Sequence, residues 1–279
     1  MSTPSLPPSD SPIAVAIADR PDRTDASFDA LVAEAAEASV DGWNFSWLDG
    51  RATEERPSWG YHRLLSSGLA AARAGLDIQT GGGEVLAGAG TKGFPPTMVA
   101  TEGWPANLVR ATNRLHPLGV VVVADPEDPP LPFADGAFDL VSSRHPATVH
   151  WSEITRVLAS GGTYLAQHVG SGANVEISEW FLGPIGVSDR RHHDIERADA
   201  EVAGLEIVRC ENERLRLEFF DVGAMIFFLR KVVWTVPDFT IEGHLDRLRA
   251  MHIEIQNEGR FRSSTSRTLF ELRKLAEYI

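Results

Sequence analysis

The stretch "AGLDIQTGGGEVLAGA", residues 74–89, decides the fold, because an apolar run ends at an acid and is followed by three glycines and an apolar helical pattern. Glycines at such a turn permit positive φ and let a ligand approach the backbone closely. The helix predicted from Glu84 directs free N–H groups toward the same turn. Two structures suit this pattern, a nucleotide-binding turn and a tight strand-to-helix connection.

The chain after residue 74 alternates short apolar runs with helical segments. The runs are residues 76–78, 97–100, 120–124, 138–142 and 163–166. This alternation predicts an α/β fold, with a mostly parallel sheet covered by helices on both faces and ligands bound at the carboxyl ends of its strands. Later segments predict a strand (214–220), a buried apolar stretch (221–234) and a helix ending at a glycine (241–259). The segment 266–274 is either a closing strand, which we favour, or a terminal helix.

Composition excludes several classes of protein. The 279-residue chain is 43% hydrophobic, which suits a large globular domain with a modest appendage. Its formal charge of −13 disfavours nucleic acid as a partner. The single cysteine forms no internal disulfide, and no cysteine–histidine cluster indicates a metal. The sequence shows neither a signal peptide nor a membrane span, so we expect a cytoplasmic protein.

A second acid supports a nucleoside site. Glu102 ends the next apolar run, in "MVATEGW" (98–104), roughly twenty residues after Gly83. An acid there can hold the two hydroxyls of a ribose. The turn lacks the G-x-G-x-x-G spacing that seats a pyrophosphate on a helix N-terminus, and Asp77 would repel phosphates. Asp77 would instead attract a cationic aminoacyl group, which favours S-adenosylmethionine over a dinucleotide.

Four segments in order resemble the class I S-adenosylmethionine-dependent methyltransferases: "LDIQTGGGE" (76–84), "ATEGWPANLVRA" (100–111), "LPFADGAFDLVSSRH" (131–145) and "EITRVLASGGTYLAQHVG" (153–170). More narrowly, the chain resembles a bacterial branch with the pattern TGGGE…TEG…RH…QHVG. The resemblance implies a Rossmann-like, seven-stranded sheet with one antiparallel strand. We expect a disordered tail (1–25), an N-terminal helical cap (26–74) and a methyltransferase domain (75–279) with substrate or lid elements around 176–258.

The resemblance also implies where the cofactor contacts the chain. Around the methionine moiety it places Asp77, Gln79, Thr80, Gly81, Gly82 and Gly83. It places Glu102 on the ribose, with Gly103 and Trp104 at the adenine. The loop after the third strand would meet the adenine edge through Glu127 with Asp128, or through Asp125. Ser143, Arg144 and His145 would face the sulfonium and the substrate. Gln79 departs from the family, which has a glycine there.

Methyl transfer needs a general base only where the nucleophile starts protonated. His145 is the first candidate, with Arg144 beside it to bind a carboxylate. His168 is either a second catalytic residue or a structural histidine. Trp43, Trp47, Trp59 and Tyr61 are either a lid or packing anchors. The helix within 244–259 is either a lid or a dimer face.

These features predict an S-adenosylmethionine-dependent methyltransferase acting on a small molecule. Three alternatives stay open: methylation of RNA or another macromolecule, a non-catalytic S-adenosylmethionine-binding regulator, and a nicotinamide-dependent oxidoreductase, which the spacing of the turn disfavours.

Overall fold

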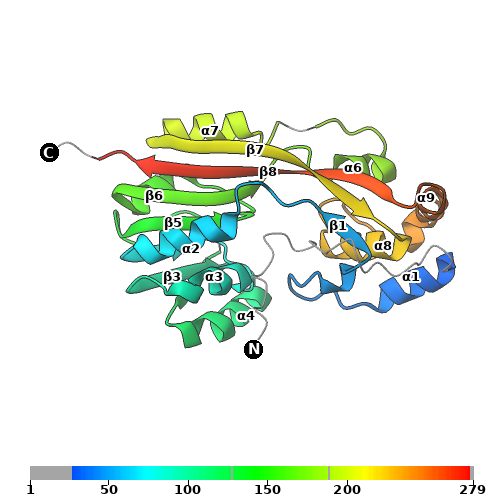
Figure 1. Cartoon of the computed structure of the whole chain (residues 1–279), viewed down its shortest axis with the longest axis horizontal. Coiled ribbons are helices and arrows are strands. Elements are labelled where there is room, and N and C mark those ends of the chain that lie inside the picture. Colours follow the sequence, from blue (N-terminus) through cyan, green and yellow to red (C-terminus); the bar gives the residue numbers. More distant parts are fainter. Residues whose placement is uncertain (1–26, 127, 188, 277–279) are drawn as a thin grey trace, which may run out of the picture.

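The computed structural model of the chain describes residues 27–126, 128–187 and 189–276. Within them, one mixed sheet of eight strands has the order β1-β7-β8-β6-β5-β2-β3-β4 (Figure 1). The strands are Ala52–Glu54 (β1), Ala74–Asp77 (β2), Thr97–Glu102 (β3), Val121–Ala124 (β4), Phe138–Arg144 (β5), Leu158–Val169 (β6), Leu205–Phe219 (β7) and Phe261–Lys274 (β8). Strands thus form at every apolar run identified in the sequence, and the expected tail at 1–25 lies outside the described residues.

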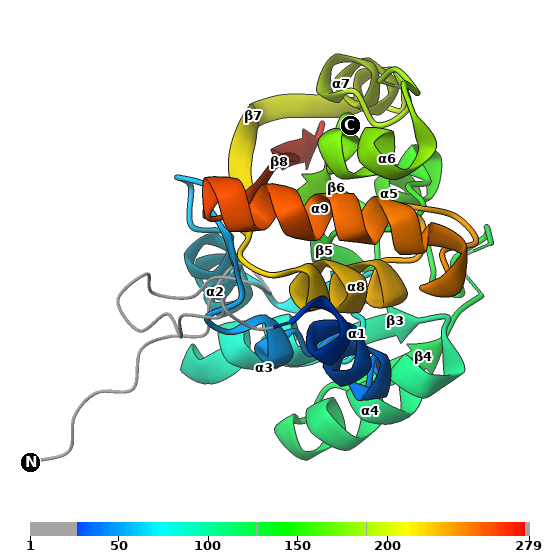
Figure 2. The same ribbon diagram turned by 90° about the vertical axis from the view of Figure 1, so that its right-hand side faces the viewer.

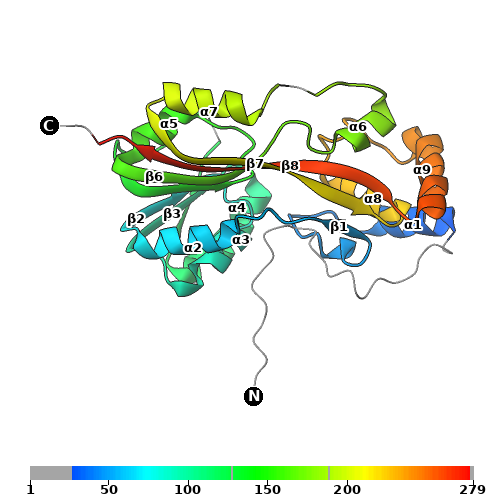
Figure 3. The same cartoon turned by 45° about the horizontal axis from the view of Figure 1, so that its top comes forward.

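Helices cover both faces of the sheet (Figure 3). The α2, α3 and α4 helices lie on one face, and α5 and α7 lie on the other. The α-helices are Phe28–Glu37 (α1), Tyr61–Ala71 (α2), Glu84–Ala89 (α3), Pro105–Leu115 (α4), Trp151–Val157 (α5), Val175–Leu182 (α6), His193–Val202 (α7), Val222–Lys231 (α8) and Leu245–Glu258 (α9). The expected α/β, Rossmann-like architecture is confirmed.

Strand directions bring the predicted site residues to one edge. The β2 strand pairs in parallel with β3 and β5, β3 pairs in parallel with β4, and β5 pairs in parallel with β6. The carboxyl ends of these five strands therefore lie at the same edge of the sheet. The β8 strand runs antiparallel between β6 and β7, as expected for the closing strand.

The expected count of seven strands is corrected to eight. The additional strand, β1, has three residues and pairs antiparallel with the end of β7, Ala52 lying opposite Phe219. A run of three residues is too short to show a period of two, and "RATEE" (51–55) is mostly polar. Only the neighbouring edge of β7 makes this segment a strand.

The antiparallel pair β7–β8 extends beyond the carboxyl edge of the parallel strands. The last residue of β6, Val169, pairs with Arg267, whereas β8 begins at Phe261 and pairs there with Phe219 of β7. At about 3.4 Å per residue, this pair of strands projects about 20 Å past β6. Its projecting half, together with β1, α1, α6, α8 and α9, forms what we call the appended lobe (Figure 2).

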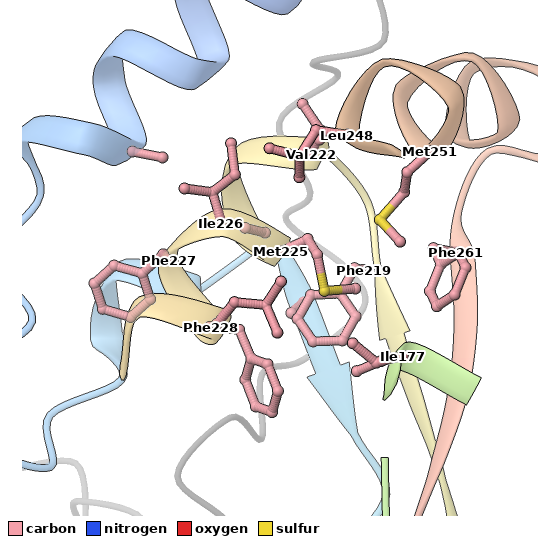
Figure 4. Packing of buried hydrophobic residues seen from close by; sticks show 14 of the residues in the cluster. Ile177, Phe219, Val222, Met225, Ile226, Phe227, Phe228, Leu248, Met251 and Phe261 are labelled. Atoms are coloured by element: carbon pink, nitrogen blue, oxygen red, sulfur yellow. The ribbon is translucent and has the colours of Figure 1, made fainter. Parts of the chain in front are cut away.

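The appended lobe has its own apolar core, centred on α8. Nearly every residue of α8 is buried, and Phe219, Leu248, Met251 and Phe261 pack around it (Figure 4). The expectation that 221–234 is buried throughout is wrong at its end, because Val233 and Trp234 are 57% and 62% exposed. Leu248, Met251 and Ile255 of α9 lie in this core. The opposite face of α9, which is polar apart from the exposed Ile253, is what remains available to a lid or a dimer.

The predicted N-terminal cap contributes to two cores. Phe28 and Leu31 of α1 pack with α8 in the appended lobe. Leu65 and Leu69 of α2 pack against the sheet instead. A buried ion pair fixes the segment between them, because Arg51 donates to both carboxylate oxygens of Asp221, the N-cap of α8, at 2.9 and 2.6 Å.

Candidate active site

Three acids stand at the carboxyl ends of adjacent strands. Asp77 ends β2, Glu102 ends β3, and Asp125 follows β4. Their exposed fractions are 6%, 5% and 4%. Three buried carboxylates that gather at one edge of a parallel sheet, beside a glycine turn, are typical of a site for a ligand with several polar groups.

Asp77 occupies an environment that disfavours its charge. Ser142 Oγ on β5 donates to Asp77 Oδ1 at 2.6 Å. This bond lowers the pKa of Asp77, but the larger effect of burial raises that pKa to about 6. A cationic group placed beside the carboxylate would lower that pKa and recover part of the desolvation cost.

The glycine turn has the conformation that its sequence predicts. Gly81 and Gly83 have φ of 65° and 77°, a region that glycine adopts without strain. Trp43 covers the turn, since a Cβ on Gly81 would lie 3.7 Å from Trp43 Cδ1. Trp234 lies against Trp43, with ring centroids 5.8 Å apart. Two partly exposed indoles therefore border the entrance to the turn.

Gln79 takes the glycine position with φ of 56°. Its amide is committed to the protein: Nε2 donates to the Thr148 carbonyl at 2.8 Å, and Oε1 accepts from the Ala147 N–H at 2.6 Å. Its side chain thus ties the turn after β2 to the loop after β5. Thr80 continues the turn by donating its N–H to the Thr101 carbonyl at 2.9 Å.

Glu102 is held by the start of α4. Its Oε1 accepts the N–H of Trp104 at 2.8 Å, which orients the carboxylate across the end of β3. Gly103 is half-buried, and Trp104 is 66% exposed beside it.

A pocket beside Gln79 joins the ends of β2, β4 and β5. Its apolar walls include Ile78, Leu131 and Ile154, and its polar lining includes Asp125, Asp128 and Ser143. Of the rival acids, Asp125 is buried and Asp128 is exposed, while Glu127 lies outside the described residues. Such a mixture of apolar walls and a few polar groups suits a small planar ligand.

The residues after β5 form the next part of the edge. Ser143 Oγ donates to the Ile78 carbonyl at 2.8 Å, so its hydroxyl joins β5 to β2. Arg144 and His145 are half-buried, and His145 has φ of 59°. Gln167 Nε2 lies 3.0 Å from His145 Nε2. Burial and then the nearby Arg144 lower the pKa of His145 well below its ordinary value.

The catalytic alternative for His168 does not fit its position. Its side chain is fully buried on the opposite face of β6 from Gln167, as alternation along a strand requires. Tyr164 Oη and Glu196 Oε2 lie 3.0 and 3.1 Å from its two ring nitrogens. Both nitrogens are therefore engaged within the core, and the structural alternative describes this residue.

Of the four candidate lid aromatics, three are packing anchors. Trp59 is 2% exposed and donates to Gln167, and Tyr61 Oη donates to the Ser143 carbonyl at 3.1 Å. Trp47 stacks on Phe227 with centroids 4.8 Å apart. Trp43 alone among these four lies on the glycine turn.

The part of the chain that carries this site is similar to known proteins. Residues 76–166 match the family model of a methyltransferase domain. These residues form a methyltransferase domain, for which S-adenosylmethionine is the methyl donor. No curated protein sequence matches the chain.

Solved structures share the fold of this methyltransferase. A Bacillus halodurans protein assigned as a methyltransferase is 21% identical, with a TM-score of 0.53 over 77% of this chain and 99% of that one. A Deinococcus radiodurans protein of unknown function is 15% identical, with a TM-score of 0.53 over 88% and 100%. No helix within the described parts of the chain is long and apolar enough to cross a membrane.

Sequence reasoning on this methyltransferase missed three residues that shape the site. Arg156 donates to the Leu131 and Phe133 carbonyls at 2.9 and 2.7 Å, and Glu153 accepts the Leu131 N–H at 2.7 Å. This pair fixes the "LPFADG" loop against α5. The i,i+3 spacing of Glu153 and Arg156 on a predicted helix could have indicated an ion pair from the sequence alone. Gln167 had no such signal, because its partners are distant in sequence.

Proposed function

We propose that the protein transfers a methyl group from S-adenosylmethionine to a small-molecule acceptor. The observation that carries this proposal is the row of buried acids Asp77, Glu102 and Asp125 beside the glycine turn. Their chemistry fits the donor, which has an ammonium group, a ribose diol and an adenine amino group. The sulfonium supplies the methyl group for in-line displacement by the acceptor.

Each part of the donor has a matching group on the chain. Asp77 attracts the aminoacyl ammonium, and the turn at Gly81–Gly83 accommodates the methionine moiety without side chains in the way. Glu102 accepts from the ribose hydroxyls with the carboxylate that Trp104 orients. The pocket lined by Asp125, Asp128 and Leu131 receives the adenine.

The appended lobe supports a small acceptor. It stands beyond the carboxyl edge, where the acceptor must approach the methyl group (Figure 1). Trp43 and Trp234 border this approach with two partly exposed indoles. A charge of −13 argues against RNA as the acceptor. The proposal includes membership of the chain in the narrower bacterial branch with the TGGGE…TEG…RH…QHVG pattern.

Calorimetry and turnover test the proposal together. We expect S-adenosylhomocysteine to bind the purified protein, and we expect its release from S-adenosylmethionine when a pool containing the acceptor is added. Binding without release from any small-molecule or RNA pool would favour a non-catalytic regulator. Release with RNA alone would overturn the small-molecule assignment.

A further inference from the structure

Gln167 has a place in the site that is not explained by packing alone. It lies on β6, its side chain is 1% exposed, and it bridges two residues that are far away in sequence. Trp59 Nε1 donates to Gln167 Oε1 at 2.8 Å, and Gln167 Nε2 lies 3.0 Å from His145 Nε2. The Gln167 carbonyl also accepts the His145 N–H at 2.7 Å. Both the backbone and the side chain of Gln167 therefore hold His145.

The indole of Trp59 fixes which way the Gln167 amide faces. An indole N–H only donates, so the amide oxygen must face Trp59 and the amide NH2 must face His145. The amide NH2 also only donates, so His145 Nε2 must accept and cannot carry a proton. The proton of the neutral imidazole is then on Nδ1, which has no hydrogen-bond partner among the residues that the structure describes.

The charges around His145 favour the same neutral form. Arg144, Arg267 and Arg191 all disfavour a positive charge on the ring, as does His168 on the other face of the sheet. Arg267 is itself held by Glu54 at 2.6 Å, and Arg191 by Glu196 at 3.1 Å, so both arginines stay in place near the site. A protonated His145 would lose its bond from Gln167 and face these cations.

We propose that Gln167 is a positioning residue that holds His145 as the Nδ1–H tautomer, so that the ring has no free lone pair with which to act as a base. This proposal rests on the proposed function, and it changes the role first expected of His145. The lone pair of Nε2 is occupied by Gln167, and Nδ1 has no lone pair to offer. The acceptor must then be nucleophilic without deprotonation by His145.

Nitrogen NMR reports the tautomer directly. In full-length protein labelled with ¹⁵N-histidine, we expect His145 Nε2 to give a pyridine-type signal and Nδ1 a pyrrole-type signal, with His145→Asn providing the assignment. An Nε2–H tautomer, or a ring protonated at pH 7, would overturn the proposal. This measurement needs no substrate, so it can succeed or fail independently of methyl transfer.

A matched pair of variants tests the cause. Gln167→Glu places an acceptor on both sides, so we expect the His145 proton to move to Nε2 and the ring to become protonated between pH 5 and 8. Gln167→Met has similar bulk and no hydrogen bond, so we expect a mixture of tautomers and no new protonation. If the tautomer is unchanged in both folded variants, Gln167 does not set it.

Turnover gives a second readout in the same variants. With the acceptor identified, Gln167→Glu should add an ionisation to the pH profile of kcat while S-adenosylhomocysteine affinity stays within about twofold. A fall in activity of equal size in both variants, with no change in the pH profile, would indicate a merely structural role and contradict the proposal.

Discussion

Replacement of Glu102 by Gln tests whether a ribose is held at the end of β3. Glu102 is 5% exposed, and its Oε1 accepts the Trp104 N–H at 2.8 Å. Gln keeps an oxygen for that bond and nearly the same volume, so the start of α4 should be unchanged. The variant loses the negative charge, and its second oxygen becomes an NH2 donor that one ribose hydroxyl would have to face.

The expected loss follows from the bonds removed. A hydrogen bond to a charged group contributes about 1.5–3 kcal/mol. Because each 1.4 kcal/mol corresponds to about a tenfold change in affinity, the Kd for S-adenosylhomocysteine should rise about 10- to 150-fold. The free energy of unfolding should change little, since the bond to Trp104 remains.

Isothermal titration calorimetry measures this loss, with Glu201→Gln on the outer helix α7 as the control. The 2′-deoxy analogue of S-adenosylhomocysteine completes a double-mutant cycle. It should bind more weakly than the parent compound to the wild type and about equally to Glu102→Gln. If Glu102→Gln binds the parent compound as tightly as the wild type does, the ribose is held elsewhere and the reasoning is wrong.

Three further outcomes follow from the same structure. Asp77→Asn should weaken cofactor binding and yet stabilise the fold at pH 7 by at most about 3 kcal/mol. The folded pKa of about 6 exceeds the ordinary 3.8, so wild-type stability falls as the pH rises through this range. Thermal unfolding should therefore show no difference between the two proteins at about pH 3, below the unfolded pKa. Gly81→Val should abolish cofactor binding because φ at this position is 65°. Gly119 has a similar φ of 82°, but it lies at the opposite edge of the sheet with open space around it, so Gly119→Val should leave cofactor binding intact. Calorimetric titration of both variants with S-adenosylhomocysteine measures the difference. Asp221→Ala should cost about 3–5 kcal/mol in urea unfolding. It removes both bonds between the buried Arg51 and Asp221 and the N-cap of α8, and leaves Arg51 only its half-exposed partner Glu34. A loss under about 1 kcal/mol would contradict this.

Local sequence was sufficient for the parallel half of the sheet. The strands of this half, β2 to β6, are short apolar runs bounded by turn residues, and their order along the chain predicts that their ends meet at one edge. Asp77 and Glu102 were found because each directly follows such a run. The closing strand β8 was favoured over a terminal helix for 266–274, and the structure confirms the strand.

The appended lobe could not be predicted in the same way. The α8 segment is apolar on every side, so its sequence shows burial but not what surrounds it. The β1 strand exists only because the end of β7 offers an edge. The ion pair of Arg51 with Asp221 joins positions 170 apart, a separation at which the sequence has no periodic signal.

The sequence by itself determined the fold class, the cofactor and the acids at the strand ends, because all three depend on residue order within single strand–turn–helix units. Tertiary structure alone decided what surrounds the two histidines. His145 follows β5 and has Gln167 Nε2 3.0 Å from its Nε2, whereas His168 lies within β6 and is enclosed between Tyr164 and Glu196. Side-chain protonation depends on neighbours brought together by folding, and no local pattern encodes those neighbours.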